Sequence, residues 1–209
     1  MAETSASEET TAAEPAWEES TEPEEPQPSL KRIWVGDSRM VGVRDFAQFD
    51  EEKDVFIAEI GQGLGWFETE ALPMLQDYLN QGEVGMVLFN LGINDCAATY
   101  QEETGTRAGA YINHLNKLAE HYPQVRFLIC SLGPCQAEKY AGRLDIAALN
   151  REAAVFNAEM KEAFPETYIP AGEYLASIDY RTWDGMHYDA ETTRDWYAYV
   201  HACLTSIEP

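Results

Sequence analysis

The chain has 209 residues and a formal net charge of −23, with 14 Lys and Arg against 37 Asp and Glu. This balance argues against nucleic acid or an anionic membrane as a partner, because both require clustered Lys and Arg. No apolar run approaches the ~20 residues that a membrane-spanning helix needs, so we expect no membrane insertion.

Residues 1–29 differ in composition from the rest. They hold nine Glu and no Lys or Arg, and they are rich in Thr, Ser, Ala and Pro. Such a segment cannot bury enough apolar surface to offset its ordering entropy, so we expect a disordered tether. An acidic tether of this kind predicts an extracellular or cell-surface protein whose signal segment is absent from this chain. Residues 30–209 are enough for one domain with a full core.

After residue 30, apolar runs alternate with longer amphipathic stretches. The first run, 33–35, has the β-branched and aromatic character of a buried strand, and Gly36 follows it. Apolar residues at helical spacing predict the helices. The predicted strands are 33–35, 54–60, 84–91, 125–132 and 167–170, and the predicted helices are 39–49, 67–80, 106–122, 146–164 and 190–204.

Strands that alternate with helices imply a parallel sheet with helices on both faces. We therefore expect an α/β protein, a three-layer α/β/α sandwich of the flavodoxin-like kind with about five parallel strands. The carboxyl ends of such strands share one edge of the sheet, and ligands bind at that edge.

Ser38 lies just after the first predicted strand. Taken alone, Gly36-Asp37-Ser38 favours an ordinary helix N-cap, since Asp and Ser are preferred capping residues. Far along the chain, however, Asp184 precedes His187 by three residues. A hydroxyl nucleophile needs a base, and the base needs a partner that sets its tautomer. Ser38, His187 and Asp184 supply these three roles.

Other chemistries fit the residues less well. Residues 61–65 carry Gly at alternate positions after a strand, but the spacing is not the GxGxxG of a dinucleotide loop. Asp184 and His187 are also possible metal ligands, yet no third ligand lies near them in sequence. Asp95 is most simply the cap of the next helix. We expect no metal and no cofactor.

The four cysteines are too few and too scattered for a disulfide scaffold. None forms a CxxC pair, which argues against a zinc site. Cys130 and Cys203 lie in strand and helix patterns and are simplest as core residues. Cys96 and Cys135 lie in loops after consecutive strands, where they could form a disulfide if the protein is exported.

Four short motifs now stand in order: Gly36-Asp37-Ser38, Gly61-Gln62-Gly63, Gly92-Ile93-Asn94-Asp95 and Asp184-Gly185-Met186-His187. In their order and spacing, from residue 31 to about 205, the chain resembles the SGNH or GDSL-like hydrolase family. One block would be weak evidence, whereas four in sequence are specific. The chain departs from the family's first motif at Arg39, where leucine is common.

The resemblance implies an oxyanion hole beside the nucleophile. Its donors would be the backbone N–H of Ser38, a backbone N–H of Gly63 and the side-chain amide of Asn94. Gly61 is the alternative to Gly63, because the turn offers several glycines. Removing one such donor typically costs ~3 kcal/mol of transition-state stabilisation.

These observations predict a serine esterase that removes a short acyl group, such as acetyl, from a small-molecule or glycan ester. The sugar is inferred from the tether, the breadth of the family and nearby aromatic residues, although burial of apolar area is the commoner reason for aromatics. An acyltransferase with the same triad and a non-catalytic carbohydrate-binding module are the alternatives. The oligomeric state is not indicated. The expected substrate rim consists of Arg39, Trp66, Trp183 and Tyr188.

Overall fold

The computed structural model describes residues 30–97 and 107–205. The tether predicted over residues 1–29 lies outside the described residues. It stays a prediction, as does the extracellular or surface location inferred from it.

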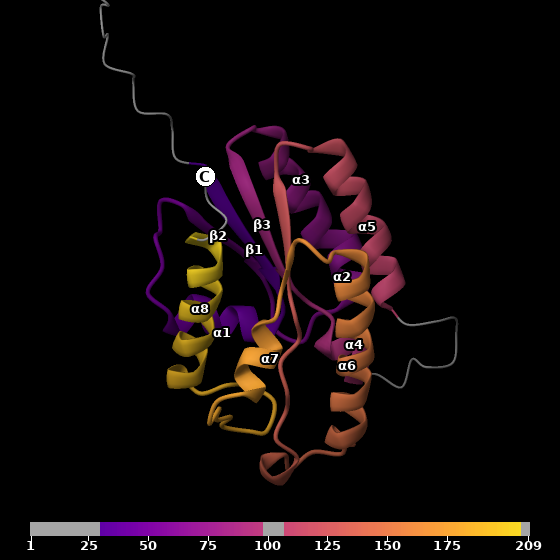
Figure 1. The fold of residues 1–209 in the computed structure, drawn as a ribbon, viewed down its shortest axis with the longest axis vertical. Coiled ribbons are helices and arrows are strands. Elements are labelled where there is room, and N and C mark those ends of the chain that lie inside the picture. The colour runs from indigo at the N-terminus through magenta and orange to yellow at the C-terminus, as the bar shows by residue number, and fades with distance from the viewer. Residues whose placement is uncertain (1–29, 98–106, 206–209) are drawn as a thin grey trace, which may run out of the picture.

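Five parallel strands form one sheet in the order β2-β1-β3-β4-β5 (Figure 1). The register pairs Ile33 with Val55 on one side and with Val87 on the other, so β1 lies in the middle of three long strands. The predicted parallel α/β sheet is confirmed. The strands are β1 (Lys31–Gly36), β2 (Asp54–Ala58), β3 (Val84–Asn90), β4 (Arg126–Cys130) and β5 (Tyr168–Ile169).

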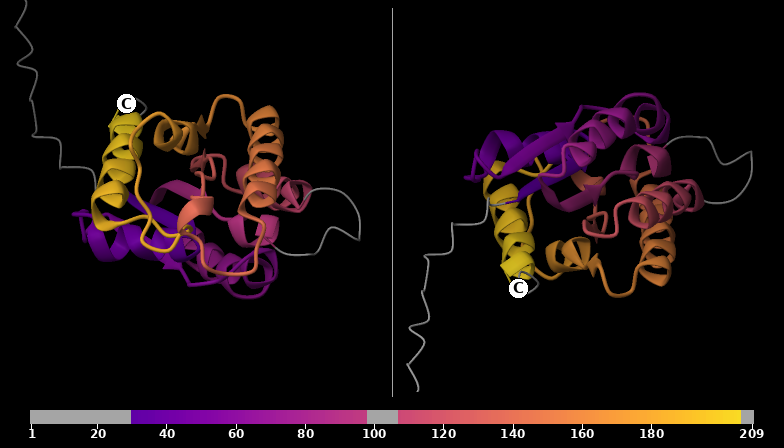
Figure 2. Two further views of the ribbon diagram at one scale, coloured as in Figure 1. Left: turned by 90° about the horizontal axis from the view of Figure 1, so that it is seen from below. Right: turned by 90° about the horizontal axis from the view of Figure 1, so that it is seen from above.

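Helices cover both faces of this sheet, which makes the predicted three layers (Figures 1 and 2). On one face, α2, α3, α5 and α6 bury a core that includes Ile33 and Val35. On the other, α1, α7 and α8 pack around Trp34. Successive strand residues point to opposite faces, so a continuously apolar strand fits a sheet covered on both sides. The helices are α1 (Ser38–Phe46), α2 (Leu64–Trp66), α3 (Leu72–Asn80), α4 (Ile93–Ala97), α5 (Ala108–His121), α6 (Ile146–Ala163), α7 (Ala171–Ala176) and α8 (Ala190–Thr205).

The helices differ from the sequence prediction in three ways. The first helix ends at Phe46, where Ala47 takes an extended conformation, and so it does not reach 49. The helix predicted over 67–80 begins earlier, as α2, and passes through a π-helical turn (Phe67–Ala71) before Pro73 in α3. The short helices α4 and α7 were not predicted, because five or six residues are too few to show a helical period.

A buried ion pair holds the amino-terminal ends of β1 and β2 together. Arg32 donates from Nε and Nη2 to the two carboxylate oxygens of Asp54, at 2.8 and 3.0 Å. The indole of Trp34 donates to the same carboxylate at 2.8 Å. This cluster lies at the opposite end of β1 from Gly36, and so away from the edge where the predicted site lies.

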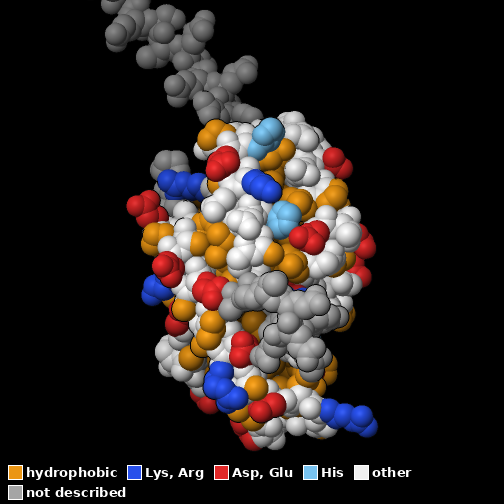
Figure 3. Space-filling model, turned by 90° about the vertical axis from the view of Figure 1, so that its right-hand side faces the viewer, with side chains coloured by type: hydrophobic (Ala, Val, Ile, Leu, Met, Phe, Trp, Pro, Cys, Tyr) orange, Lys and Arg blue, Asp and Glu red, His pale blue; other side chains and the backbone are white. Residues whose placement is uncertain are grey.

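No described helix is both long and apolar enough to cross a membrane. On the face shown in Figure 3, Lys and Arg side chains are dispersed among acidic and hydrophobic ones rather than gathered together. This dispersal fits the acidic composition and gives that face no basic patch for a polyanion.

Candidate active site

The turn after β1 places Ser38 at the carboxyl edge of the sheet. A Cβ on Gly36 would lie 2.6 Å from Cβ of Met40 and 2.7 Å from the carbonyl oxygen of Asn90, so only glycine allows this tight passage. Asp37 is the N-cap of α1, and its side chain accepts the Arg39 N–H at 3.0 Å. Because Asp37 does the capping, the Ser38 hydroxyl is available for another partner, and the N-cap alternative for Ser38 is wrong.

Ser38 and His187, 149 positions apart, meet at this edge. The Ser38 Oγ lies 2.9 Å from His187 Nε2, and His187 Nδ1 lies 2.7 Å from Asp184 Oδ2. Asp184 Oδ1 also accepts the backbone N–H groups of Met186 and His187, at 2.9 and 2.8 Å. The three side chains predicted from the sequence therefore form one continuous hydrogen-bonded chain.

The electrostatics of Asp184 favour a fixed imidazole tautomer. Partial burial opposes its charge, but the hydrogen bonds from the His187 backbone and ring and from Met186 outweigh burial and hold the pKa of Asp184 below its usual value. An ionised Asp184 accepts a hydrogen bond from Nδ1–H and so keeps the proton on Nδ1, which leaves Nε2 of His187 as the acceptor facing the serine hydroxyl. This is the arrangement that general-base catalysis needs.

Gly185 allows the Asp184–His187 turn to close. Its φ is +91°, in the region that favours glycine, and a Cβ there would lie 2.8 Å from the carbonyl oxygen of Gln136 and from Cα of Tyr140. The Gly185 carbonyl in turn accepts the N–H of Gln136 at 2.8 Å. Any other residue at 185 would push this turn away from its support.

The predicted oxyanion donors come from two neighbouring turns. Asn94, in α4 after β3, donates one amide hydrogen to the carbonyl of Gln62 at 2.8 Å, and an amide has a second hydrogen to offer. Gly61 has a φ of +76° with open space at its Cβ position, so a glycine is favoured there by the backbone conformation of the turn and not by a close neighbour. Gly63 has an extended backbone, but a Cβ there would meet the carboxylate of Asp95. The structure therefore brings Asn94 and the Gly61–Gly63 turn together.

Asp95 anchors this turn, and the prediction that it caps the next helix is wrong. Its side chain is 4 % exposed and accepts the Leu64 N–H at 3.1 Å and the Tyr111 hydroxyl at 2.7 Å, and Arg107 donates to it as well. The N-cap position of α5 belongs to Arg107. Arg107 and Tyr111 were missed, because neither stands in a motif and only folding brings them to Asp95.

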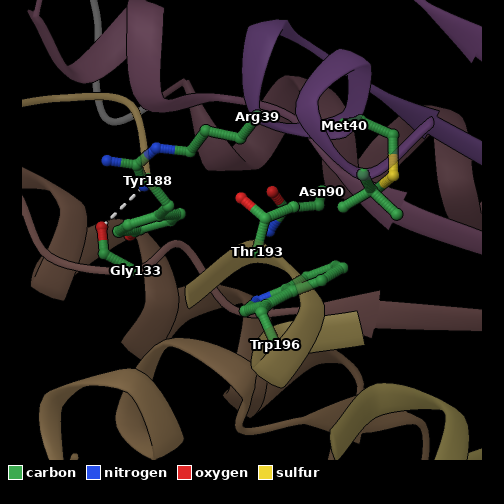
Figure 4. Close-up of a pocket in the computed structure, with 8 residues that line it drawn as sticks. Arg39, Met40, Asn90, Gly133, Tyr188, Thr193 and Trp196 are labelled. Carbon is green, nitrogen blue, oxygen red and sulfur yellow. Dashed lines mark hydrogen bonds between the residues drawn. The ribbon is translucent and has the colours of Figure 1, made fainter. Parts of the chain in front are cut away.

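The four residues expected on the substrate rim have different positions. Arg39 and Tyr188 are each only 8 % exposed. The Arg39 side chain leaves the first turn of α1 toward the interior, where its guanidinium lies over the Tyr188 ring (Figure 4). Trp66 is half-buried and packs against the core. Trp183 is 67 % exposed, and its indole stacks on the ring of His187, with centroids 5.3 Å apart and planes at 19°. Of the four, Trp183 has the exposure expected of a rim residue.

All four cysteines are free in the structure, so the proposed Cys96–Cys135 disulfide is not formed. Cys135 is buried, and its sulfur accepts a hydrogen bond from Arg39 at 2.9 Å. Burial raises the pKa of Cys96 to about 12, which keeps that thiol protonated. Within residues 30–97 and 107–205, no group of three or more His, Cys, Asp or Glu side chains is placed to hold a metal ion.

A small cavity of about 10 Å³ lies between α1 and α8 (Figure 4). This volume holds one water molecule at most, so the cavity is not a substrate pocket. It is lined by Arg39, Met40, Val43, Asn90, Gly133, Tyr188, Thr193 and Trp196.

No protein-family model and no curated protein matches the sequence. Solved structures do match. A GDSL-like lipase from Bacteroides thetaiotaomicron aligns with a TM-score of 0.62 at 17 % identity, covering 86 % of this chain and 87 % of that one. A lipase/acylhydrolase from Enterococcus faecalis aligns with a TM-score of 0.59 at 12 % identity, covering 85 % of this chain and 96 % of that one. The C-terminal catalytic domain of a peptidoglycan O-acetyltransferase from Streptococcus pneumoniae aligns with a TM-score of 0.53 at 14 % identity, covering 85 % of this chain and 94 % of that one.

Likenesses at these identities concern the fold. The chain has the fold of the SGNH or GDSL-like hydrolases, as the four sequence motifs predicted.

Proposed function

We propose that this protein is a serine esterase that hydrolyses short-chain acyl esters, with Ser38 as nucleophile, His187 as general base and Asp184 as its orienting partner. The observation that carries the proposal is the unbroken hydrogen-bond chain from the Ser38 hydroxyl through His187 to Asp184. A non-catalytic binding module has no need to keep all three groups in register at 2.7–2.9 Å.

In the first half-reaction, the Ser38 Oγ attacks the ester carbonyl carbon while His187 Nε2 takes the hydroxyl proton. The carbonyl oxygen becomes an oxyanion that accepts hydrogen bonds from the backbone of Ser38, from Gly63 and from the Asn94 amide. The position of Ser38 at the start of α1 supports its role as a donor, since the first N–H groups of a helix have no partner within it. Collapse breaks the bond to the leaving oxygen, and His187 returns the proton to the departing alcohol.

In the second half-reaction, water attacks the acyl-serine. His187 removes one proton from this water, the same donors hold the new oxyanion, and the Ser38 oxygen leaves with the proton that His187 carries. The products are the carboxylic acid and the regenerated enzyme. No metal or cofactor takes part in either step.

The substrate class within the proposal is a short acyl ester of a carbohydrate. Its support is Trp183, which presents a largely exposed indole directly beside His187. An aromatic face next to a catalytic group suits the apolar face of a sugar ring, and its exposure is otherwise unfavourable.

Acyl transfer to a hydroxyl group is the second candidate. Its support is the shared fold with the O-acetyltransferase domain, together with an exposed Trp183 that could hold an acceptor sugar as well as a donor. The two functions share the acyl-serine and differ only in what attacks it.

The test is hydrolysis of p-nitrophenyl acetate, butyrate and octanoate by the full chain and by Ser38→Ala. Ser177→Ala is the matched control, because within the described part of the chain the Ser177 hydroxyl bonds only to the local Tyr174 carbonyl at the end of α7. We expect activity that decreases with acyl length, disappears in Ser38→Ala and survives in Ser177→Ala. A folded wild-type protein with no esterase activity would overturn the proposal. Acyl-sugar products formed at the expense of free acid, on addition of a sugar acceptor, would favour transfer.

A further inference from the structure

Arg39 is a buried cation next to the nucleophile, and the catalytic steps above do not use it. Its side chain is almost fully enclosed, yet it forms no hydrogen bond to a carboxylate among the described residues. Its partners are instead the carbonyl oxygen of Gly133, at 2.7 Å (Figure 4), the carbonyl oxygen of Met186, at 3.2 Å, and the sulfur of Cys135, at 2.9 Å. A charge buried among neutral acceptors is a poor source of stability.

The two contacts of Arg39 with the 177–189 loop flank His187. Met186, whose carbonyl accepts from the guanidinium, immediately precedes His187. Tyr188, whose ring lies under the guanidinium with 4.8 Å between the Arg39 Cζ and the ring centroid, immediately follows it. The Tyr188 hydroxyl donates to the carbonyl of Pro134 at 3.0 Å, so the ring under Arg39 is itself held in place.

Arg39 also immediately follows Ser38. Among the hydrogen bonds of the described residues, two join α1 to this loop: the Ser38–His187 bond and the Arg39–Met186 bond. The other bonds of the loop run within it, to α7, to residues 134–139 and to the start of α8, such as Thr182 to Gln136 and Arg181 to Thr192. Arg39 therefore ties both chain neighbours of His187 directly to the helix that carries Ser38, through the Met186 carbonyl and the Tyr188 ring.

We propose that Arg39 is a positioning residue that sets the Ser38–His187 geometry by clamping residues 186 and 188 to the first turn of α1. This inference rests on the proposed function for its kinetic consequences. A guanidinium suits the role, because its planar, multiply donating head can serve three acceptors and stack on a ring at once, which an ammonium cannot. Burial opposes the charge, but Tyr188, Cys135 and Asp37 outweigh it and raise the pKa of Arg39, so the clamp stays protonated.

The test compares Arg39→Met and Arg39→Lys with Arg32→Met. Met keeps an unbranched apolar stem but loses every donor, whereas Lys keeps the charge and one donating head. Arg32 is the matched control, because it is an equally buried arginine whose contacts, with Asp54, lie at the far end of β1. Each variant is assayed for kcat and KM with p-nitrophenyl acetate, and for unfolding by urea.

We expect Arg39→Met to lower kcat on the order of 10²-fold with little change in KM, since a displacement of about 1 Å in a reacting group has this effect. Arg39→Lys should recover part of kcat. Arg32→Met should unfold more easily and keep its kcat while folded. A folded Arg39→Met protein with wild-type kcat, or an equal loss of kcat in Arg32→Met, would overturn the clamp.

A second measurement does not depend on activity. The His187 Nδ1 proton, held between His187 and Asp184, should give a downfield proton resonance in wild type and in Arg32→Met, and it should broaden or vanish in Arg39→Met. If Arg39→Met fails to fold, Tyr188→Leu removes the clamp from its other side and should give the same loss of signal. An unchanged resonance in these variants would overturn the clamp. An inactive wild type with the resonance intact would overturn the esterase proposal alone.

Discussion

A Cβ atom on Gly63 would lie 2.7 Å from Oδ2 of Asp95, so the two residues approach as closely as only a glycine allows. The same carboxylate accepts the N–H of Leu64, the next residue. The buried Asp95 carboxylate therefore supports the turn that carries Gly63, a proposed oxyanion donor, and the shape of this turn depends on that contact.

Gly63→Ala should consequently lower kcat by about 10²-fold or more, because the added methyl group moves a proposed oxyanion donor away from the carbonyl oxygen. Gly65→Ala is the control, since no described atom outside its own helical turn lies within 4 Å of its Cβ position and alanine suits a helix better than glycine. Steady-state kinetics with p-nitrophenyl acetate measures both. Equal kcat in Gly63→Ala and wild type would remove Gly63 from the oxyanion hole.

Tyr111→Phe should lower the free energy of unfolding by about 1–3 kcal/mol, because it withdraws a donor from the buried, charged Asp95. The phenyl ring keeps its contacts with Phe67, Phe89 and Phe156. Tyr122→Phe removes a comparable bond, to the neutral amide of Asn80 at 2.8 Å, and should cost about 1 kcal/mol. Urea unfolding at neutral pH compares them, and a Tyr111→Phe variant as stable as wild type would contradict the anchoring role of Asp95.

Asp37 should make stability fall as pH rises from about 4 to 6. Burial raises its pKa from 3.8 to about 6, against the opposing effects of Arg39 and His187 and with a smaller contribution from Asp95. The folded protein therefore keeps a proton that the unfolded chain releases in this window, and its stability is lost as pH rises through it. A shift of this size corresponds to about 3 kcal/mol.

Asp37→Asn isolates this effect. Asparagine keeps the N-cap bond to Arg39 and mimics the protonated acid, whose Oδ2 has no hydrogen-bond partner among the described residues. Urea unfolding at pH 4.5 and 7.5 should show a wild type that loses stability relative to Asp37→Asn at the higher pH. A constant difference between the two proteins would mean that Asp37 titrates normally.

Trp183→Ala should raise KM for an acetylated oligosaccharide and change kinetics on p-nitrophenyl acetate little, because the small ester needs no stacking surface. Stability should change by no more than about 0.5 kcal/mol, since the side chain is largely exposed. Phe46→Ala is the control, as an exposed aromatic at the other end of α1 from Ser38. An unchanged KM for every acetylated oligosaccharide tested would remove the carbohydrate from the proposed function.

Much of this arrangement could be predicted from local patterns. Apolar runs separated by helical stretches predicted the parallel sheet, and a parallel sheet brings strand ends to one edge, which is why Ser38 and Asn94 could be placed there. The Asp184 and His187 pair was visible because both residues belong to one turn.

Contacts made by packing were not predictable in this way. Arg39 stands one residue from Ser38, yet its helical position does not say whether it faces solvent or the interior, and it was expected on the rim. Arg107 reaches Asp95 across twelve residues of sequence with no motif between them. The contacts of the cysteines were also not predictable, since Cys135 packs against Arg39 and does not pair with Cys96.

The most direct test of Ser38 as an activated nucleophile is reaction of the full chain with a fluorophosphonate, followed by peptide mass spectrometry. We expect one covalent adduct, on Ser38, which forms much more slowly in His187→Ala and is absent from Ser38→Ala. A folded wild-type protein that forms no adduct, or carries it on another residue, would contradict the assignment of Ser38 as an activated nucleophile.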